Sequence, residues 1–176
     1  MNISRIKNNT ISKTYLTVSI LGNSLKLNIK YKNNDSIELN KTNTEIIIII
    51  PKKYKNLDNI NIINLAIKKM YNKIAETEIE YAMEIARHIL KFAPNDYTIK
   101  RLDNAFYKCL KNKIIVNPDI VKYNRDIINT TILQAFCRIK YKYNSASYKN
   151  YLNEALHKYE LYKNNSTSKL SILKIS

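Results

Sequence analysis

The chain contains few side chains of the types that hold a metal ion. Two cysteines, Cys109 and Cys137, and two histidines, His88 and His157, are all that 176 residues provide. Zinc sites take thiolate, imidazole and carboxylate ligands, usually in local pairs a few residues apart. The four residues are scattered without such spacing. We therefore expect no metal site and no cofactor, and the sparse cysteines fit a reducing compartment.

Two of these residues have simpler interpretations. Glu84 and His88 are four residues apart, the spacing of a pair on one helical face, so we expect a surface Glu–His pair. Nothing near Cys137 in the sequence indicates a lowered thiol pKa. We interpret Cys137 as a small buried hydrophobic residue.

A run of alternating cationic and aromatic side chains is the second group of residues that could bind a ligand. Residues 138–143 are Arg-Ile-Lys-Tyr-Lys-Tyr, and Tyr-Lys-Asn-Tyr follows at 148–151. Such cations can follow phosphates while tyrosine rings stack on unpaired bases. The alternative is that tyrosines 148, 151 and 159 face the core. The candidate nucleic-acid contacts are Arg138, Lys140, Lys142, Lys149, Lys52, Lys53, Lys100 and Arg101.

The net charge supports a polyanionic partner but has a second possible cause. Thirty Lys and Arg against fourteen Asp and Glu give +16, a charge that attracts DNA, RNA or a nucleoprotein. Abundant Lys, Asn and Ile with 14 Tyr, one Gly and no Trp also follow AT-rich codons. We therefore expect a low-GC bacterium, an organelle or a virus as the source, and codon bias remains an alternative origin of the charge.

No segment is suited to a membrane or to secretion. The first nine residues lack the apolar core of a secretory signal. The longest apolar run, Ile46–Ile50, is far shorter than a membrane span. We expect a cytoplasmic or otherwise intracellular protein with no membrane partner.

The elements that position these residues are predicted to form one α+β domain over residues 1–163. Apolar alternation predicts an N-terminal antiparallel sheet with strands at 16–20, 25–31, 37–39 and 44–50. Five consecutive isoleucines in the last of these strands predict that both of its faces are covered. A long helix over about 58–91 follows, with apolar residues at helical spacing.

The C-terminal half is predicted to contain a second β-hairpin and two helices. A short strand over 97–102 precedes the hairpin at 106–116. A helix follows over about 124–140, with Ile127 and Ile128 among its inward residues. A last helix runs from Ser145, which is a suitable N-cap, to about residue 162. Residues 164–176 are expected to form a flexible tail.

The order of these elements resembles a known family. The elements are a strand ending at Pro51, a helix, a hairpin strand Phe106-Tyr-Lys-Cys109, a next strand ending at Asn117, and a helix before Ser145-Ala-Ser-Tyr148. In their order, these predicted elements resemble those of the YgjP-like metallopeptidases. These are relatives of the SprT and Wss1 zinc proteases. The resemblance covers about residues 24–160 and implies a zincin-like fold with a zinc cofactor.

The residues that would hold that zinc are missing. We align the family's H-E-x-x-H motif with this chain by counting from Asn117 without a gap. The two histidines of the motif then correspond to Gln134 and Arg138, and its glutamate corresponds to Ala135. The third histidine falls at Asn144. Amides bind zinc poorly, Arg138 cannot lose its proton, and Ala135 cannot act as a base. The resemblance therefore implies a non-catalytic binding or scaffold protein.

Two other functions remain alternatives. An active metal-dependent peptidase with a rearranged site would bind about one zinc per chain. A structural RNA-binding subunit of a large particle would need only the basic charge and a flexible tail. The SprT and Wss1 relatives act on proteins attached to DNA, which implies a nucleoprotein partner.

Arg138 has two interpretations. We hypothesise that its guanidinium replaces the lost cation and hydrogen-bonds Gln134 and Asn144. The alternative is an arginine that faces solvent.

Overall fold

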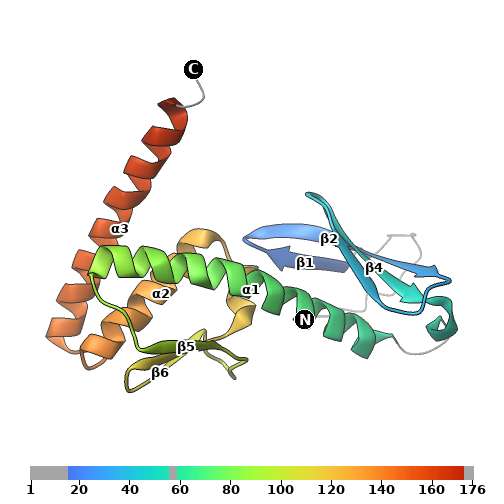
Figure 1. Ribbon diagram of the computed structural model, residues 1–176, viewed down its shortest axis with the longest axis horizontal. Helices are drawn as coiled ribbons and strands as arrows, with labels where there is room; N and C mark the ends of the chain where they lie inside the picture. Colours follow the sequence, from blue (N-terminus) through green and yellow to red (C-terminus); the bar gives the residue numbers. More distant parts are fainter. Residues whose placement is uncertain (1–15, 56–58, 173–176) are drawn as a thin grey trace, which may run out of the picture.

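The computed structural model describes residues 16–55 and 59–172, with side chains as far as residue 165. Over these described residues it is an α+β structure of two small sheets and three α-helices (Figure 1). Helix α1 (Ile60–Leu90) runs along both sheets, with the first sheet beside its N-terminal half and the second beside its C-terminal half.

The first sheet is mixed. Its strands, in the order β1-β2-β4-β3, are β1 (Leu16–Ile20), β2 (Asn23–Lys32), β4 (Glu45–Pro51) and β3 (Glu38–Lys41). The pairs β1–β2 and β3–β4 are antiparallel, but β2–β4 is parallel. The prediction of a wholly antiparallel sheet was therefore wrong for the central pair.

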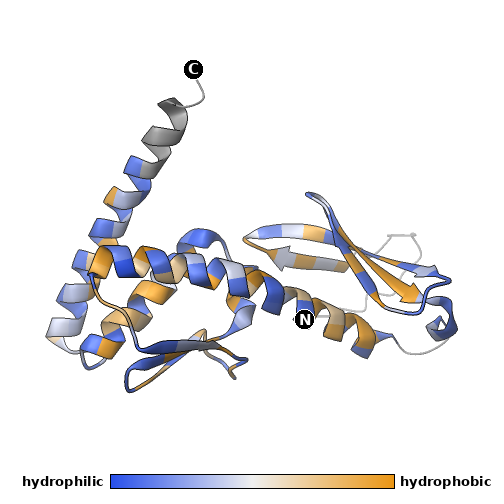
Figure 2. Ribbon diagram, viewed as in Figure 1, coloured by the Kyte–Doolittle hydropathy of each residue, from blue (hydrophilic) through white to orange (hydrophobic). Residues whose placement is uncertain are grey.

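The isoleucine run in β4 explains this arrangement. A simple meander would leave β4 at an edge, whereas here it lies between β2 and β3. Ile46, Ile48 and Ile50 are fully buried and Ile49 is nearly so, which places both faces of the strand in apolar surroundings. Figure 2 shows β4 as a hydrophobic strand. Central placement removes more apolar surface from water than an edge would.

The turn between β1 and β2 joins the first sheet to the second half of the chain. Leu21 and Gly22 both have positive φ, 49° and 81°, as a tight hairpin turn requires. Their amides donate to the carbonyls of Val121 at 2.7 Å and Lys122 at 3.2 Å. A Cβ at position 22 would lie 3.1 Å from the Cβ of Asn124, so this close approach favours glycine.

The second sheet has the strand order β5-β7-β6. Its strands are β5 (Asp96–Ile99), β6 (Tyr107–Leu110) and β7 (Lys113–Val116), with β5–β7 parallel and β6–β7 antiparallel. Asn117 ends β7. Its Nδ2 donates to the carbonyls of Leu102 and Ala105, both at 3.0 Å, so the side chain fixes the loop before β6.

The two C-terminal helices begin with the caps that their sequences favour. After the short 3-10 helix η2 (Pro118–Lys122), α2 (Arg125–Lys140) is capped by Asn124, whose Oδ1 accepts from the amide of Ile127 at 2.9 Å. Helix α3 (Ala146–Ile172) is capped by Ser145, whose Oγ accepts from the amide of Tyr148 at 3.1 Å, as predicted.

Two details of these helices differ from the predictions. Helix α3 continues to Ile172, beyond the predicted end near residue 162. Ile127, predicted to face inward, is 39% exposed. It lies in the first turn of α2, where the neighbouring Ile128 takes the buried position instead.

Helices long and apolar enough to cross a membrane are absent from the residues that the structure describes.

The carboxylate of Asp119 connects η2 to the chain after β5. It accepts from Lys122 Nζ at 2.8 Å and is ion-paired with Arg101. Burial raises the pKa of Asp119, but the hydrogen bond and charge of Lys122, with those of Arg101, outweigh burial and hold the pKa below its ordinary value of 3.8. The folded state therefore favours the ionised form.

This lowered pKa predicts an acid-dependent loss of stability. The stabilisation is fully present above the unfolded pKa and is lost as pH falls through the folded pKa. We expect Asp119→Asn to lower the free energy of unfolding at pH 7 by about 1–2 kcal/mol, and by clearly less at pH 3. Urea titrations of both proteins at the two pH values measure this, and an equal difference at both would contradict it.

Candidate nucleic-acid interface

Four of the predicted nucleic-acid contacts lie together where α2 passes into α3. Arg138 and Lys140 are in the last turn of α2, Lys142 is in the connecting turn and Lys149 is in the first turn of α3. All four side chains are exposed. We call these residues, with Tyr141, Tyr143 and Tyr151, the α2–α3 corner.

Tyrosine pairs hold the α2–α3 corner together. The rings of Tyr141 and Tyr151 are 5.1 Å apart in an edge-to-face arrangement, and those of Tyr143 and Tyr148 are 5.4 Å apart. Each pair joins the segment after α2 to α3. Such pairs contribute about 0.5–1.5 kcal/mol of stabilisation in addition to that from the burial of their surface. The tyrosines of the run therefore help to fix the geometry of the corner.

Two of the cations lie over these rings. Lys140 Nζ is 4.6 Å from the ring centre of Tyr151 and 5.6 Å from that of Tyr141. The guanidinium carbon of Arg138 is 4.8 Å from the ring centre of Tyr143. Cation–π attraction at these distances limits where the charges can move while leaving them exposed.

The tyrosines divide between core and surface. Tyr148 and Tyr159 are buried and Tyr151 is half-buried, as the core-facing alternative predicted. Tyr143 is 56% exposed, and the guanidinium of Arg138 lies over its ring. Burial raises the pKa of Tyr148, so its phenol stays neutral at physiological pH.

Tyr107 of β6 joins this cluster, which sequence reasoning missed. Burial raises the pKa of Tyr107 to about 12, and a hydrogen bond with Arg138 acts in the opposite direction. The strand alternation of Tyr107 with Cys109, both half-buried, is the available signal that Tyr107 faces α2.

The other predicted contacts lie elsewhere. Lys52 and Lys53 belong to the short helix η1 (Lys52–Tyr54), at the opposite end of α1 from the α2–α3 corner (Figure 1). Lys100 follows β5 and is exposed, while Arg101 is engaged with Asp119. The structure therefore brings together four of the eight candidates.

The positions at which the resemblance would place zinc ligands and a catalytic base differ in their burial. Ala135 is fully buried, and the Sγ of Cys109 donates to its carbonyl oxygen at 3.5 Å. Gln134 is half-buried, whereas Arg138 and Asn144 are exposed, with φ of 64° at Asn144. A carboxylate at position 135 would therefore point into the core.

The hypothesis that Arg138 replaces a lost cation was wrong. Within the described part of the chain, no hydrogen bond joins Arg138 to Gln134 or Asn144; the guanidinium instead contacts Tyr143 and Tyr107. The solvent-facing alternative describes it better, because the rings at the helix end attract the guanidinium and leave it accessible.

Glu84 and His88 are engaged in other contacts, and Cys137 is buried. Glu84 pairs with Arg87, not with His88 as predicted, because Arg87 is also within one turn and carries a full charge. The ring of His88 lies 5.8 Å from that of Tyr162. Cys137 is fully buried, as interpreted, and burial raises its pKa to about 11. No three His, Cys, Asp or Glu residues form a metal-binding group among those described.

Comparison of the chain with protein-family models, with curated proteins and with solved structures finds no match.

Proposed function

We propose that this protein is a non-catalytic, intracellular binding protein whose α2–α3 corner holds a single-stranded segment of RNA or DNA, free or within a nucleoprotein. The observation that carries the proposal is the presence of four exposed cations, Arg138, Lys140, Lys142 and Lys149, where α2 passes into α3. The same corner contains the exposed Tyr143, and the guanidinium of Arg138 lies over its ring. Several cations within one corner can follow the phosphates of a flexible single strand.

Single strands suit this corner better than a duplex. A base must be unpaired to stack on Tyr143, a residue that is 56% exposed and has the guanidinium of Arg138 over its ring. Each such stack contributes about 1–3 kcal/mol by alanine substitution. A duplex hides its base faces and would contact only the cations.

The proposed lack of catalysis rests on the residues at the positions of the family motif. In our proposal the chain is a degenerate relative of the YgjP-like metallopeptidases that kept the order of helices and strands. Gln134, Ala135 and Asn144 have neither an imidazole nor a carboxylate. Hydrolysis by zinc-bound water needs both the metal and a general base.

Fluorescence anisotropy tests the proposal. The full chain is titrated into a fluorescein-labelled strand of about eight nucleotides and into a duplex of the same sequence, over about 50–200 mM salt. We expect the strand to bind more tightly than the duplex, with log K falling linearly as log[salt] rises. Equal affinity for both, or no binding to the strand at the lowest salt, would contradict the proposal.

A further inference from the structure

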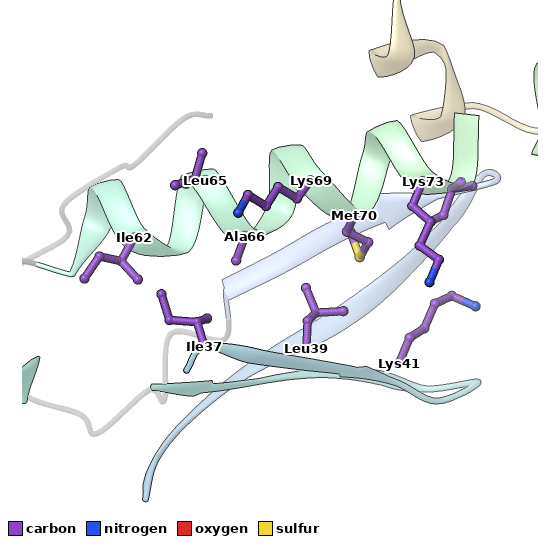
Figure 3. Close-up of a pocket in the computed structure, with 10 residues that line it drawn as sticks. Ile37, Leu39, Lys41, Ile62, Leu65, Ala66, Lys69, Met70 and Lys73 are labelled. Atoms are coloured by element: carbon purple, nitrogen blue, oxygen red, sulfur yellow. The ribbon is translucent and has the colours of Figure 1, made fainter. Parts of the chain in front are cut away.

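An apolar groove lies between the edge strand β3 and the first half of α1, on the side of the molecule away from the α2–α3 corner (Figures 1 and 3). Its volume is about 390 Å³. Figure 3 shows Ile37 and Leu39 on one side and Ile62 and Met70 on the other, directed toward the space between them. Leu65, on the same helix, also lines the groove. We call it the β3–α1 groove.

The groove exists because one helix cannot cover this sheet. Strands are spaced about 4.8 Å apart, and a helix with its side chains is about 10–12 Å across, so a single helix covers two or three strands. Helix α1 buries the inner faces of β1, β2 and β4, while Leu39 of β3 is only half-buried. Within residues 16–55 and 59–172, no second helix covers β3, the outermost strand of the layer.

Large apolar side chains therefore remain in contact with water. Leu65 is 52% exposed and Ile37 is 41% exposed. Helix α1 carries apolar residues on the flank that faces the groove, Ile62 and Leu65, in addition to the stripe of Ile63 and Ile67 that packs on the sheet. A second helix lying beside α1, at the usual 8–10 Å between axes, would bury these side chains and complete the layer.

The charge around the groove selects the partner. Lys41, Lys69 and Lys73 line it, and none of the described residues that line it is acidic. The N-terminal segment 1–15 contains Arg5, Lys7 and Lys13 and no acidic residue, so it does not complement these lysines. A second copy would bring together two chains that each carry +16, which is unfavourable.

We propose that the β3–α1 groove binds an amphipathic helix of another protein, with leucine-like residues against Leu39, Leu65 and Met70 and carboxylates opposite the three lysines. This is helix-in-groove recognition with i, i+3, i+4, i+7 anchors. The groove is independent of the α2–α3 corner, so the chain would connect an acidic protein partner to a nucleic acid.

A defined peptide tests the groove. The probe is a fluorescein-labelled helix of about 18 residues with leucines at i, i+3, i+4 and i+7 and glutamates on both flanks; a second probe replaces every glutamate by glutamine. Titrating the full chain into each, we expect the acidic peptide to bind at least tenfold more tightly than the neutral one. Equal affinity of the two peptides would overturn the assignment of an acidic partner.

Two variants locate the binding. Leu65→Lys should weaken the acidic peptide at least tenfold, although it adds a positive charge, because it removes an anchor contact. Lys69→Glu should weaken it similarly, whereas the matched Lys68→Glu, on the same helix but lining a different cavity, should change it less than threefold. Circular dichroism checks that each variant is folded.

Three results would overturn the proposal: equal loss of binding in Lys68→Glu and Lys69→Glu, unchanged binding in Leu65→Lys, and concentration-dependent dimerisation that Leu65→Lys abolishes. The first two would show that general charge attraction holds the peptide. The last would show that a second copy of the chain occupies the groove.

Discussion

Phe136→Ala is expected to lower the free energy of unfolding by about 3–5 kcal/mol, which makes it the largest single effect on stability that we predict. Phe136 is fully buried in α2, and its ring lies 5.5 Å from that of Phe92, just after α1 ends. Its removal leaves a cavity where these two helices meet. The loss is measured by equilibrium denaturation in urea.

Phe106→Ala is the matched control. The ring of Phe106 also pairs with another aromatic ring, that of Tyr123 at 5.1 Å, but the residue is 39% exposed. We expect this variant to lose only about 1 kcal/mol. Similar losses in the two variants would mean that α1 and α2 do not share the tight core that the structure describes.

A double-mutant cycle separates the ring pair from the cavity. If Phe92 and Phe136 interact through their rings, the double variant should lose less than the sum of the single variants, by about 0.5–1.5 kcal/mol. Strict additivity would assign the whole effect of Phe136 to burial.

The fold was largely predictable from the sequence because its elements have strong local signals. Alternation over residues 16–20 and 25–31 predicted β1 and β2, and helical spacing predicted α1 within two residues at its start. Ser145 marked the start of α3 because a hydroxyl cap has a recognisable sequence context. Each of these signals arises from residues adjacent in the chain.

The topology of the first sheet was not predictable in the same way. The sequence identified β4 as a strand buried on both faces, but not its place between β2 and β3. That place depends on comparing the burial gained in alternative strand orders. The parallel pairing of β2 with β4 can be inferred only if the isoleucine-rich strand β4 is assumed to lie inside the sheet and not at its edge.

The candidate sites show the same division. The run 138–151 was recognisable because cations and tyrosines alternate in the sequence. The separation of Lys52 and Lys53 from this run was not predictable, because it is set by the length of α1. The β3–α1 groove was also missed. Its signal is the apolar flank formed by Ile62 and Leu65, which a single amphipathic stripe does not require.

Removal of three corner cations is the second large effect that we predict. The variant Arg138→Gln, Lys142→Gln, Lys149→Gln should bind a single strand of about eight nucleotides roughly a hundredfold more weakly at 0.1 M salt. Each phosphate contact contributes about 0.7 to the slope of log K against log[salt] on single strands, so the slope should fall by about 2. Salt-dependent anisotropy titrations measure both quantities.

The variant Lys52→Gln, Lys53→Gln, Lys55→Gln removes the same charge from the other end of α1 and serves as the control. If binding depended on the net charge of +16 alone, the two triple variants would lose affinity equally. A localised interface instead requires the corner variant to lose most of its affinity while the control stays within about threefold of the unmodified chain. Equal losses would place the binding in the general field of the protein, with its lysines explained by codon bias, and would remove the α2–α3 corner as a site.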